Sequence, residues 1–293
     1  MIRFMRFKWF YFLLSGLVLV PGIISLIFWG LTPSIDFTGG SLLEYKFSKP
    51  QDRTKIEQIL KEGKFDFSSV QTSGGNSYLI RAKSLNQETA VKIKSSLGDG
   101  LKDVPTEIRF ETVGPILGKE LIFKTVVAVL MAAGFIMFYV AWAFKNAKFG
   151  VCAILAMFHD TFVMLGIFSL LGHFAQVEVD TLFVTAMLTI LSFSVHDTVV
   201  VYDRIRESQR RFPGTPFVDL VDKAVTETLS RSLNNSLTII FMLLALLLLG
   251  GSTVKWFVFA LFVGTISGTY SSTFTAAPLL VIWEQLSLKR RKA

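Results

Sequence analysis

A carboxylate inside a long apolar segment constrains this chain more than any other feature. Residues 181–206 are typical of a membrane-spanning helix, and Asp197 lies within that segment. An ionisable side chain at bilayer depth costs roughly 2.5–3.5 kcal/mol on insertion scales. We therefore expect Asp197 to face a partner group or a wet path instead of lipid, which makes it the first candidate for a functional residue.

The apolar residues predict an integral membrane protein. Of the 293 residues, 52% are hydrophobic, and they are gathered in long runs. A helix needs about 20 apolar residues to cross the hydrocarbon core. Six membrane-spanning helices are predicted, near residues 10–31, 121–144, 149–171, 180–203, 232–250 and 254–283.

The basic residues predict how the chain is oriented. The formal net charge of +8 comes from Lys and Arg beside the apolar runs, where anionic lipid and topology account for them, so no nucleic-acid partner is expected. The short basic segments are the two terminal tails and residues 145–148 and 204–231. Because such segments stay in the cytoplasm, we expect a multi-pass protein of the cytoplasmic (inner) membrane with both termini inside.

A polar segment after the first span predicts an external domain. Residues 33–119 contain expected strands at 41–47, around 70, at 78–81 and at 107–111, and expected helices at 54–60 and 87–97, with a turn at 73–76. This order is that of the split βαβ, ferredoxin-like arrangement. The predicted fold class is an α-helical integral membrane protein with six transmembrane helices plus one external α+β ferredoxin-like domain.

The rest of the chain completes the predicted domain organisation. Residues 1–32 form a cytoplasmic tail and the first span, and residues 120–293 form a five-helix transmembrane domain. Near 216–230 the apolar residues recur at helical spacing after Pro216, which predicts an amphipathic helix on the inner surface. This helix is either a connector on the lipid headgroups or a docking face for a cytoplasmic partner, and both interpretations stay open.

Two polar stripes are predicted on neighbouring spans, near their cytoplasmic ends. Residues three and four apart share a helix face. The stripe on the fourth span comprises Ser194, Asp197 and Thr198. The stripe on the fifth span comprises Arg231, Asn234, Asn235 and Thr238. If the stripes face each other, Asp197 and Arg231 come into contact.

Such a contact would suit proton exchange. A cation favours the charged carboxylate and desolvation favours the neutral acid, so a carboxylate held between the two can exchange protons. Moving one charge through the membrane potential is worth ~2.3 kcal/mol per 100 mV. The predicted proton path comprises Asp197, Arg231, Asp160, His196, Asn234, Asn235 and Thr198. The alternative is a structural ion pair that only fixes helix packing.

For two residues of this predicted path, two roles are each consistent with the sequence. Asp160 lies in the third span, about 15 Å from its cytoplasmic end, and either extends the path or is an uncharged acid bonded to a neighbouring helix. His196 precedes Asp197 and is either a proton relay or a packing group. The dispersed histidines exclude a credible metal site, and no nucleophile setting is present. We therefore predict no enzyme, metal or cofactor, and a proton gradient as the energy source.

Glycines mark two further motifs. Gly264 and Gly268 form a small-xxx-small pair in the sixth span, which is typical of close helix packing. A second motif follows the first span and would let the chain bend sharply, as a hinge or as a plain tight turn. It comprises Asp36, Phe37, Thr38, Gly39 and Gly40.

Taken together, three motifs closely resemble the SecF family of bacterial protein-export membrane proteins. They are residues 36–40, the run at 197–207 (DTVVVYDRIRE) and residues 231–236 (RSLNNS). The resemblance covers nearly the whole chain and includes the six spans and the domain after the first. At one position the chain departs from the family pattern, because His196 stands where asparagine is common before the acid.

The resemblance implies an auxiliary subunit of the Sec protein translocase, related to the resistance-nodulation-division superfamily and driven by proton motive force in late stages of export. The implied partners are a SecD-like subunit, the Sec channel of SecY, SecE and SecG, the translocating unfolded polypeptide and the lipid bilayer. In that family the residues that match Asp197 and Arg231 belong to the proton path, and the external domain moves while it handles the polypeptide. The alternatives are a small-molecule or lipid exporter subunit and a non-transporting membrane scaffold.

Overall fold

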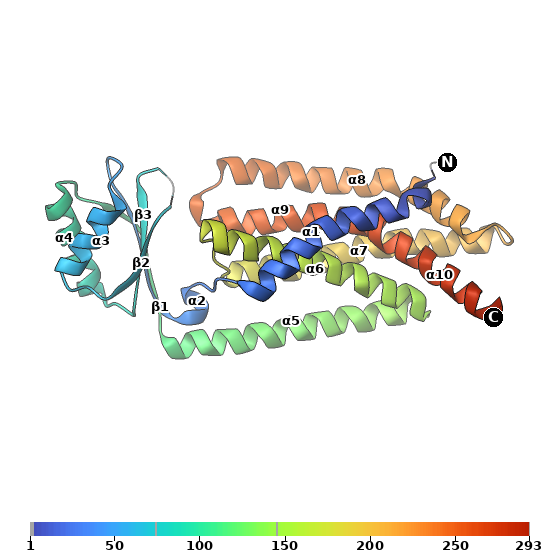
Figure 1. The fold of residues 1–293 in the computed structure, drawn as a ribbon, viewed down its shortest axis with the longest axis horizontal. Coiled ribbons are helices and arrows are strands. Elements are labelled where there is room, and N and C mark those ends of the chain that lie inside the picture. The colour runs from blue at the N-terminus through green and yellow to red at the C-terminus, as the bar shows by residue number, and fades with distance from the viewer. Residues whose placement is uncertain (1–2, 74, 145, 293) are drawn as a thin grey trace. The chain divides into compact units, whose positions relative to one another are not determined.

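The protein is described by a computed structural model that covers residues 3–73, 75–144 and 146–292. The chain divides into two compact units (Figure 1). The helical unit combines the chain up to Thr32 with the chain from Val127 onward, and the sheet unit is Pro33–Val126. Gly74, in the predicted turn, and Lys145, in a predicted basic segment, lie outside the described residues.

Helical segments of different lengths build the helical unit. They are the 3-10 turn η1 (Phe4–Phe7), α1 (Lys8–Phe28), α5 (Pro115–Phe144), α6 (Ala147–Ala175), α7 (Thr181–Arg211), α8 (Phe217–Leu249), the 3-10 turn η2 (Ser252–Val254), α9 (Lys255–Ser271), the π-helix η3 (Ser272–Ala276) and α10 (Ala277–Lys292). Within the described ranges, six segments are long and apolar enough to cross a membrane. That number agrees with the prediction. The boundary expected at 119/120 falls inside α5, whose first residues belong to the sheet unit.

The segment near 216–230 is not a separate helix. It is the first half of α8, which runs without a break into the fifth span because no Gly or Pro interrupts residues 217–249. Its apolar residues Val221, Ala224 and Val225 are fully buried in the core of the helical unit. Of the two interpretations, a connector that rests this face on lipid headgroups does not fit this burial, and the position of the segment at the inner surface stays a prediction.

The sixth span changes its helical form partway along. After α9 the π-helix η3 inserts a wider turn before α10 begins. Pro278, the second residue of α10, has no backbone N–H and cannot pair with the carbonyl of Phe274, so one helical hydrogen bond is missing at this point. The sequence prediction of one continuous span missed this interruption.

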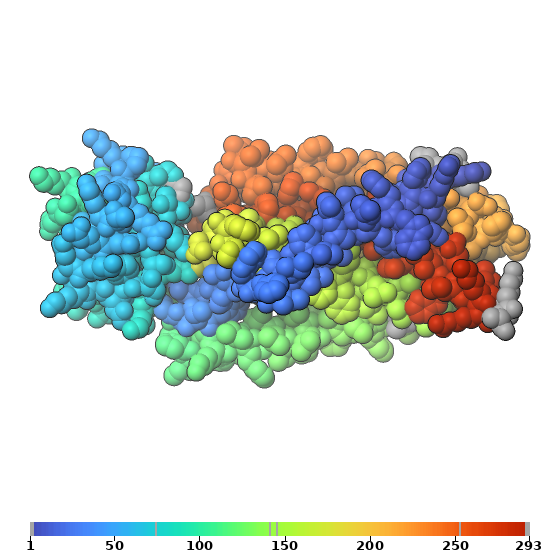
Figure 2. All heavy atoms as spheres, in the orientation of Figure 1, coloured from blue at the N-terminus to red at the C-terminus, as the bar shows by residue number. Residues whose placement is uncertain are grey.

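The centre of the helical unit is formed by α6, α7 and α9. Half of the most apolar stretch is buried in each of these segments, whereas none is buried in α5. Figure 2 shows α1, in dark blue, lying on the surface of the unit. The three central helices therefore contribute most of the buried surface of the unit.

The sheet unit follows the predicted order of strand, helix, strand, strand, helix, strand. After the short helix α2 (Ile35–Thr38) come β1 (Gly40–Lys46), α3 (Arg53–Glu62), β2 (Phe67–Thr72), β3 (Ser77–Ala82), α4 (Gln87–Leu101) and β4 (Thr106–Val113). The strands pair antiparallel in the order β2-β3-β1-β4, with Leu43 opposite Ile80 and Phe110. One core joins β1, β2 and β3 to both α3 and α4.

Helix α4 begins as predicted but ends later. The side chain of Asn86 accepts a hydrogen bond from Thr89 N, which caps the helix. The helix was expected at 87–97, yet α4 continues past Gly98 to Leu101. A Cβ atom at Gly98 would lie 3.3 Å from Val104, so the glycine serves close packing instead of helix termination.

Candidate functional site

Asp160, on α6, is the most enclosed acid of the helical unit and is 1% exposed. Its Oδ1 accepts a hydrogen bond from Ser267 Oγ at 2.6 Å, and its Oδ2 accepts from Ser194 and Ser271 at 2.5 Å each. The Nδ1 atom of His159 lies 3.0 Å from Oδ1. Three helices, α6, α7 and α9, therefore meet at this carboxylate.

Asp197, on α7, forms a second buried carboxylate site and is 5% exposed. Its Oδ2 accepts hydrogen bonds from Ser232 Oγ of α8 at 2.5 Å and from Ser272 Oγ at 2.9 Å. The hydroxyl of Thr198 beside it is buried, and no hydrogen-bond partner for it is present in the described part of the chain. Asp197 thus binds hydroxyl groups from two other helical segments.

Glycines allow the central helices to approach closely enough for these short side chains. A Cβ atom at Gly264 would lie 2.4 Å from the Ile190 side chain, and one at Gly268 would lie 3.3 Å from Phe193 and Ser194. The structure places both glycines at the contact between α7 and α9, which run side by side in Figure 1. Serine hydroxyls reach only a short distance, so this close approach is what brings them to the carboxylates.

The predicted contact between Asp197 and Arg231 is not present. Arg231 is exposed and lines an open hollow of about 600 Å³ with Asp203, Glu227 and other charged residues of α7 and α8. Successive helical residues are about 100° apart, so Ser232 points to Asp197 while Arg231 points into the open hollow. The predicted stripe of α8, with Asn234 and Asn235, is likewise exposed.

His196 is also separate from both carboxylate sites. It is exposed and lines a hollow of about 300 Å³ between α5 and α7, together with Phe135 and Tyr139. The histidine that does contact a carboxylate is His159, which is not a member of the predicted proton path. Ser267 and Ser271, which bind Asp160, are four residues apart and so share a helix face. This spacing could have indicated a polar site, but serine is also common at helix contacts that have no such role.

The motif at 36–40 forms one helical turn and a sharp bend in the sheet unit. Ser34 caps α2 by accepting a hydrogen bond from Asp36 N, and Phe37 is buried. Gly39 and Gly40 have φ values of +73° and +122°, which favour glycine. The end of the motif packs against the start of α5, because a Cβ atom at Gly39 would lie 2.9 Å from Pro115 Cα.

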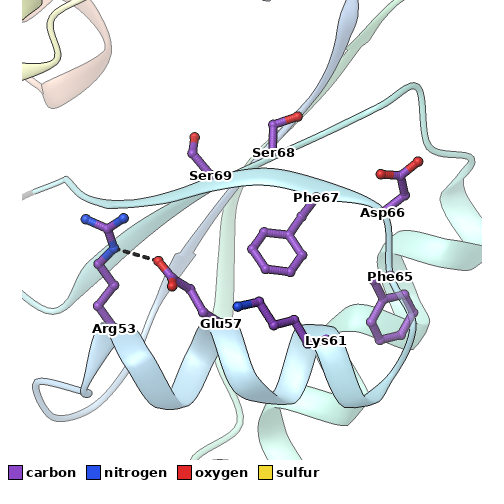
Figure 3. Close-up of a pocket in the computed structure, with 8 residues that line it drawn as sticks. All are labelled: Arg53, Glu57, Lys61, Phe65, Asp66, Phe67, Ser68 and Ser69. Atoms are coloured by element: carbon purple, nitrogen blue, oxygen red, sulfur yellow. Dashed lines mark hydrogen bonds and ion pairs between the residues drawn. The ribbon is translucent and has the colours of Figure 1, made fainter.

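The sheet unit has a hollow of its own, beside α3 and β2 (Figure 3). Its volume is about 500 Å³, and its lining combines charged groups with Phe65 and Phe67. An ion pair joins Arg53 Nε to Glu57 Oε1 at 2.7 Å. This open and mixed lining gathers no chemically specific set of groups, so the buried carboxylates of the helical unit remain the candidate site.

Comparisons with known proteins agree on one family. Residues 93–286 match the family described as protein export membrane protein SecD/SecF, C-terminal, and residues 24–51 match the SecD/SecF GG motif. Protein translocase subunit SecF of Thermobaculum terrenum is 40% identical, over 99% of this chain and 96% of that protein. The SecF subunit of Anaerolinea thermophila is 38% identical, over 97% and 94%.

A solved structure shares the fold. The crystal structure of SecDF, a translocon-associated membrane protein from Thermus thermophilus, matches with a TM-score of 0.87 and 33% identity. The match covers 97% of this chain but 39% of that one. The chain therefore corresponds to a part of the longer SecDF polypeptide.

Proposed function

This chain belongs to the SecF family of protein translocase subunits, with an auxiliary role in the Sec translocase, and we propose that proton transfer at Asp197 and Asp160 drives that role. In this proposal the protein lies in the cytoplasmic (inner) membrane with both termini in the cytoplasm. The sheet unit is a ferredoxin-like domain on the external side, and it handles the emerging unfolded polypeptide in late stages of export.

The observation that carries the proposal is the set of groups around the two acids. In the described part of the helical unit, both carboxylates bind serine hydroxyls, and no Lys or Arg contacts either of them. A hydroxyl can donate to a carboxylate and can also accept from a carboxylic acid. Both protonation states therefore keep their hydrogen bonds, whereas a structural ion pair would require a cation beside the acid.

The membrane potential supplies enough energy for proton transfer to shift the packing of the helices. One elementary charge that crosses 100 mV changes the free energy by ~2.3 kcal/mol, which biases a two-state equilibrium more than tenfold. Each acid joins three helical segments, so a change in its charge alters the balance between their packing arrangements. This is the physical route from proton transfer to helix motion.

A SecD-like partner is part of the proposal. Arg231, Asn234 and Asn235 are exposed on a membrane-spanning helix, and polar groups in that position are costly against lipid. A second membrane subunit would cover them. The SecDF polypeptide, of which this chain matches 39%, supports a SecD-like partner. In this proposal the two subunits serve the channel of SecY, SecE and SecG.

The test is export driven by a proton gradient in membrane vesicles that contain the whole complex. Asp197→Asn keeps the acceptor oxygen for Ser232 and Ser272 but cannot change its charge, so gradient-stimulated export should be lost. Asp203→Asn is the matched control, since Asp203 is an exposed acid on the same helix and pairs with Arg206. Wild-type export by Asp197→Asn in a normally assembled complex would refute proton coupling and favour a scaffold.

A further inference from the structure

Helices α1 and α6 meet along one seam with a constant offset in residue number. The seam has three layers, which are Ser15 with His159, Gly22 with Gly166, and Ser25 with Ser169. The Ser15 Oγ to His159 Nε2 distance is 3.0 Å, and the two hydroxyl oxygens of the third layer are 2.7 Å apart. Spacings of seven and three on both helices are those of parallel helices packed side by side.

This seam is the principal attachment of α1 to the helical unit. Ser15, Gly22 and Ser25 are the buried residues of α1, and most of its large apolar side chains are exposed. A Cβ atom at Gly166 would lie 2.5 Å from Gly22 Cα, so the two backbones touch in the middle layer. His159 is the titratable side chain of the seam, and it lies in the same layer as Ser15.

His159 joins this seam directly to the Asp160 carboxylate. Its Nδ1 lies 3.0 Å from Asp160 Oδ1, and its Nε2 lies 3.0 Å from Ser15 Oγ. In a neutral imidazole one nitrogen donates a hydrogen bond and the other accepts one. The protonation state of Asp160 therefore determines which nitrogen carries the hydrogen, and so the direction of the hydrogen bond to α1.

We propose that His159 transfers protons to Asp160 and thereby couples the charge of this acid to α1 through Ser15. With Asp160 ionised, Nδ1–H donates to Oδ1, and Nε2 accepts from the Ser15 hydroxyl. A proton then enters at Nε2 while the Nδ1 proton moves to Oδ1. The imidazole stays neutral, Asp160 becomes a neutral acid that donates to Nδ1, and Nε2–H now donates to Ser15 Oγ.

The groups around Ser15 allow the hydrogen bond between Ser15 Oγ and His159 Nε2 to change its donor and acceptor. Ser15 Oγ lies 3.5 Å from both Tyr270 Oη and Thr275 Oγ1, and the Tyr270 hydroxyl donates to the backbone oxygen of Tyr11 at 2.7 Å. These contacts lead toward α9, η3 and the first turn of α1. The Ser15 hydroxyl thus has other acceptors within reach when Nε2 becomes a donor.

Other titratable groups near the dyad are few. Helix α7 contributes Asp197, which Ser272 holds beside Ser271 of the Asp160 site. Glu284 of α10 pairs with Lys148 at the start of α6, which lies about 16 Å from His159 along the helix, so this pair is remote from the dyad. Helix α8 presents Ser232 and Ser236 on its buried face, while Arg231 is exposed. Within the described residues, no cation competes with His159 for Asp160.

This inference rests on the proposed function and deepens it. Helix α1 continues in sequence through Thr32 and the bend at 39–40 into the sheet unit. A change in how α1 is held by α6 is therefore passed along the chain to that unit. Ser15 is therefore a positioning residue that acts through His159, whereas Ser25 contacts another serine of the seam.

The experiment compares Ser15→Ala with Ser25→Ala, its matched control, in the complete complex. Both changes remove one hydroxyl from the same seam, but only Ser15 contacts an imidazole. Gradient-driven export and the nitrogen-15 NMR signal of His159 are measured across a pH titration. We expect Ser15→Ala to slow export roughly tenfold and to shift the tautomer transition of His159, and Ser25→Ala to change neither.

His159→Gln adds a second test, since the amide keeps a donor and an acceptor but cannot carry a proton onward. It should lose the gradient-driven step while the complex still assembles. Equal effects of Ser15→Ala and Ser25→Ala, or a His159 tautomer that stays constant with pH, would overturn the inference. If Asp197→Asn abolishes coupling while these variants do not, the proposed function stands and only the link through His159 fails.

Discussion

Ser271 and Ser272 are consecutive in sequence but donate hydrogen bonds to different carboxylates. Ser271 Oγ lies 2.5 Å from Asp160 Oδ2, and Ser272 Oγ lies 2.9 Å from Asp197 Oδ2. The π-helix η3 begins at Ser272, and short π-helical turns occur frequently at functional sites. One peptide unit therefore joins the two acids at the place where the helical form changes.

Alanine substitutions at these two positions should separate the two sites. Ser271→Ala removes a hydrogen bond to Asp160, and Ser272→Ala removes one to Asp197, each at a cost of about 1–2 kcal/mol in the free energy of unfolding. In infrared difference spectra, each variant should shift the carboxyl band of its own acid. Equal shifts of both bands in both variants would mean that the acids titrate as one unit.

Filling the α7–α9 contact should destabilise the helical unit. Gly264→Ala places a Cβ atom 2.4 Å from Ile190, so the helices must separate, at a cost of about 1–3 kcal/mol. Thermal unfolding in detergent should show a lower midpoint, and Ile190→Ala in the same chain should restore part of it. Gly16→Ala is the control, because no atom lies within 4 Å of that added Cβ. An unchanged midpoint for Gly264→Ala would contradict the close contact.

The bend before β1 should require glycine for two reasons. Gly40→Ala must adopt φ of +122° and places its Cβ atom 2.8 Å from the carbonyl oxygen of Ala82. Gly75→Ala also has a positive φ but meets open space, so it measures the conformational cost alone. We expect Gly40→Ala to cost at least about 1 kcal/mol more than Gly75→Ala in denaturant unfolding. Equal costs would indicate that the bend rearranges freely.

A pH-dependent contact is expected at Asp103 in the sheet unit. Hydrogen bonds from Ser48, and further ones from the Ser48–Gln51 segment, lower the pKa of Asp103. A depressed folded pKa stabilises the contact above the unfolded value of about 3.9, and that contribution is lost as the pH falls through the folded pKa. The amide proton signal of Ser48 should therefore titrate below about pH 4. Asp103→Asn should abolish the titration, and a titration that persists in this variant would assign it to another group.

Local patterns in the sequence determined much of the architecture. Runs of about 20 apolar residues predicted the six spans, and the alternation between strand and helix periods predicted the element order of the sheet unit, since both signals depend only on neighbours along the chain. The extent of α8 was misjudged for a related reason. Its first half has an amphipathic pattern, and only the packing of Val221 and Val225 against other helices shows that this face is buried.

The rotation of each helix was decided by the tertiary structure alone. His-Asp-Thr occurs twice, at 159–161 and at 196–198, yet His159 is buried between Ser15 and Asp160 while His196 is exposed. Likewise Ser232 reaches Asp197 and the adjacent Arg231 does not. Residues one position apart point about 100° apart on a helix, and which of them meets a neighbour depends on packing between segments that are distant in sequence. The sequence therefore identified the two acids, and the packing of α1, α6, α7 and α9 selected the groups that bind them.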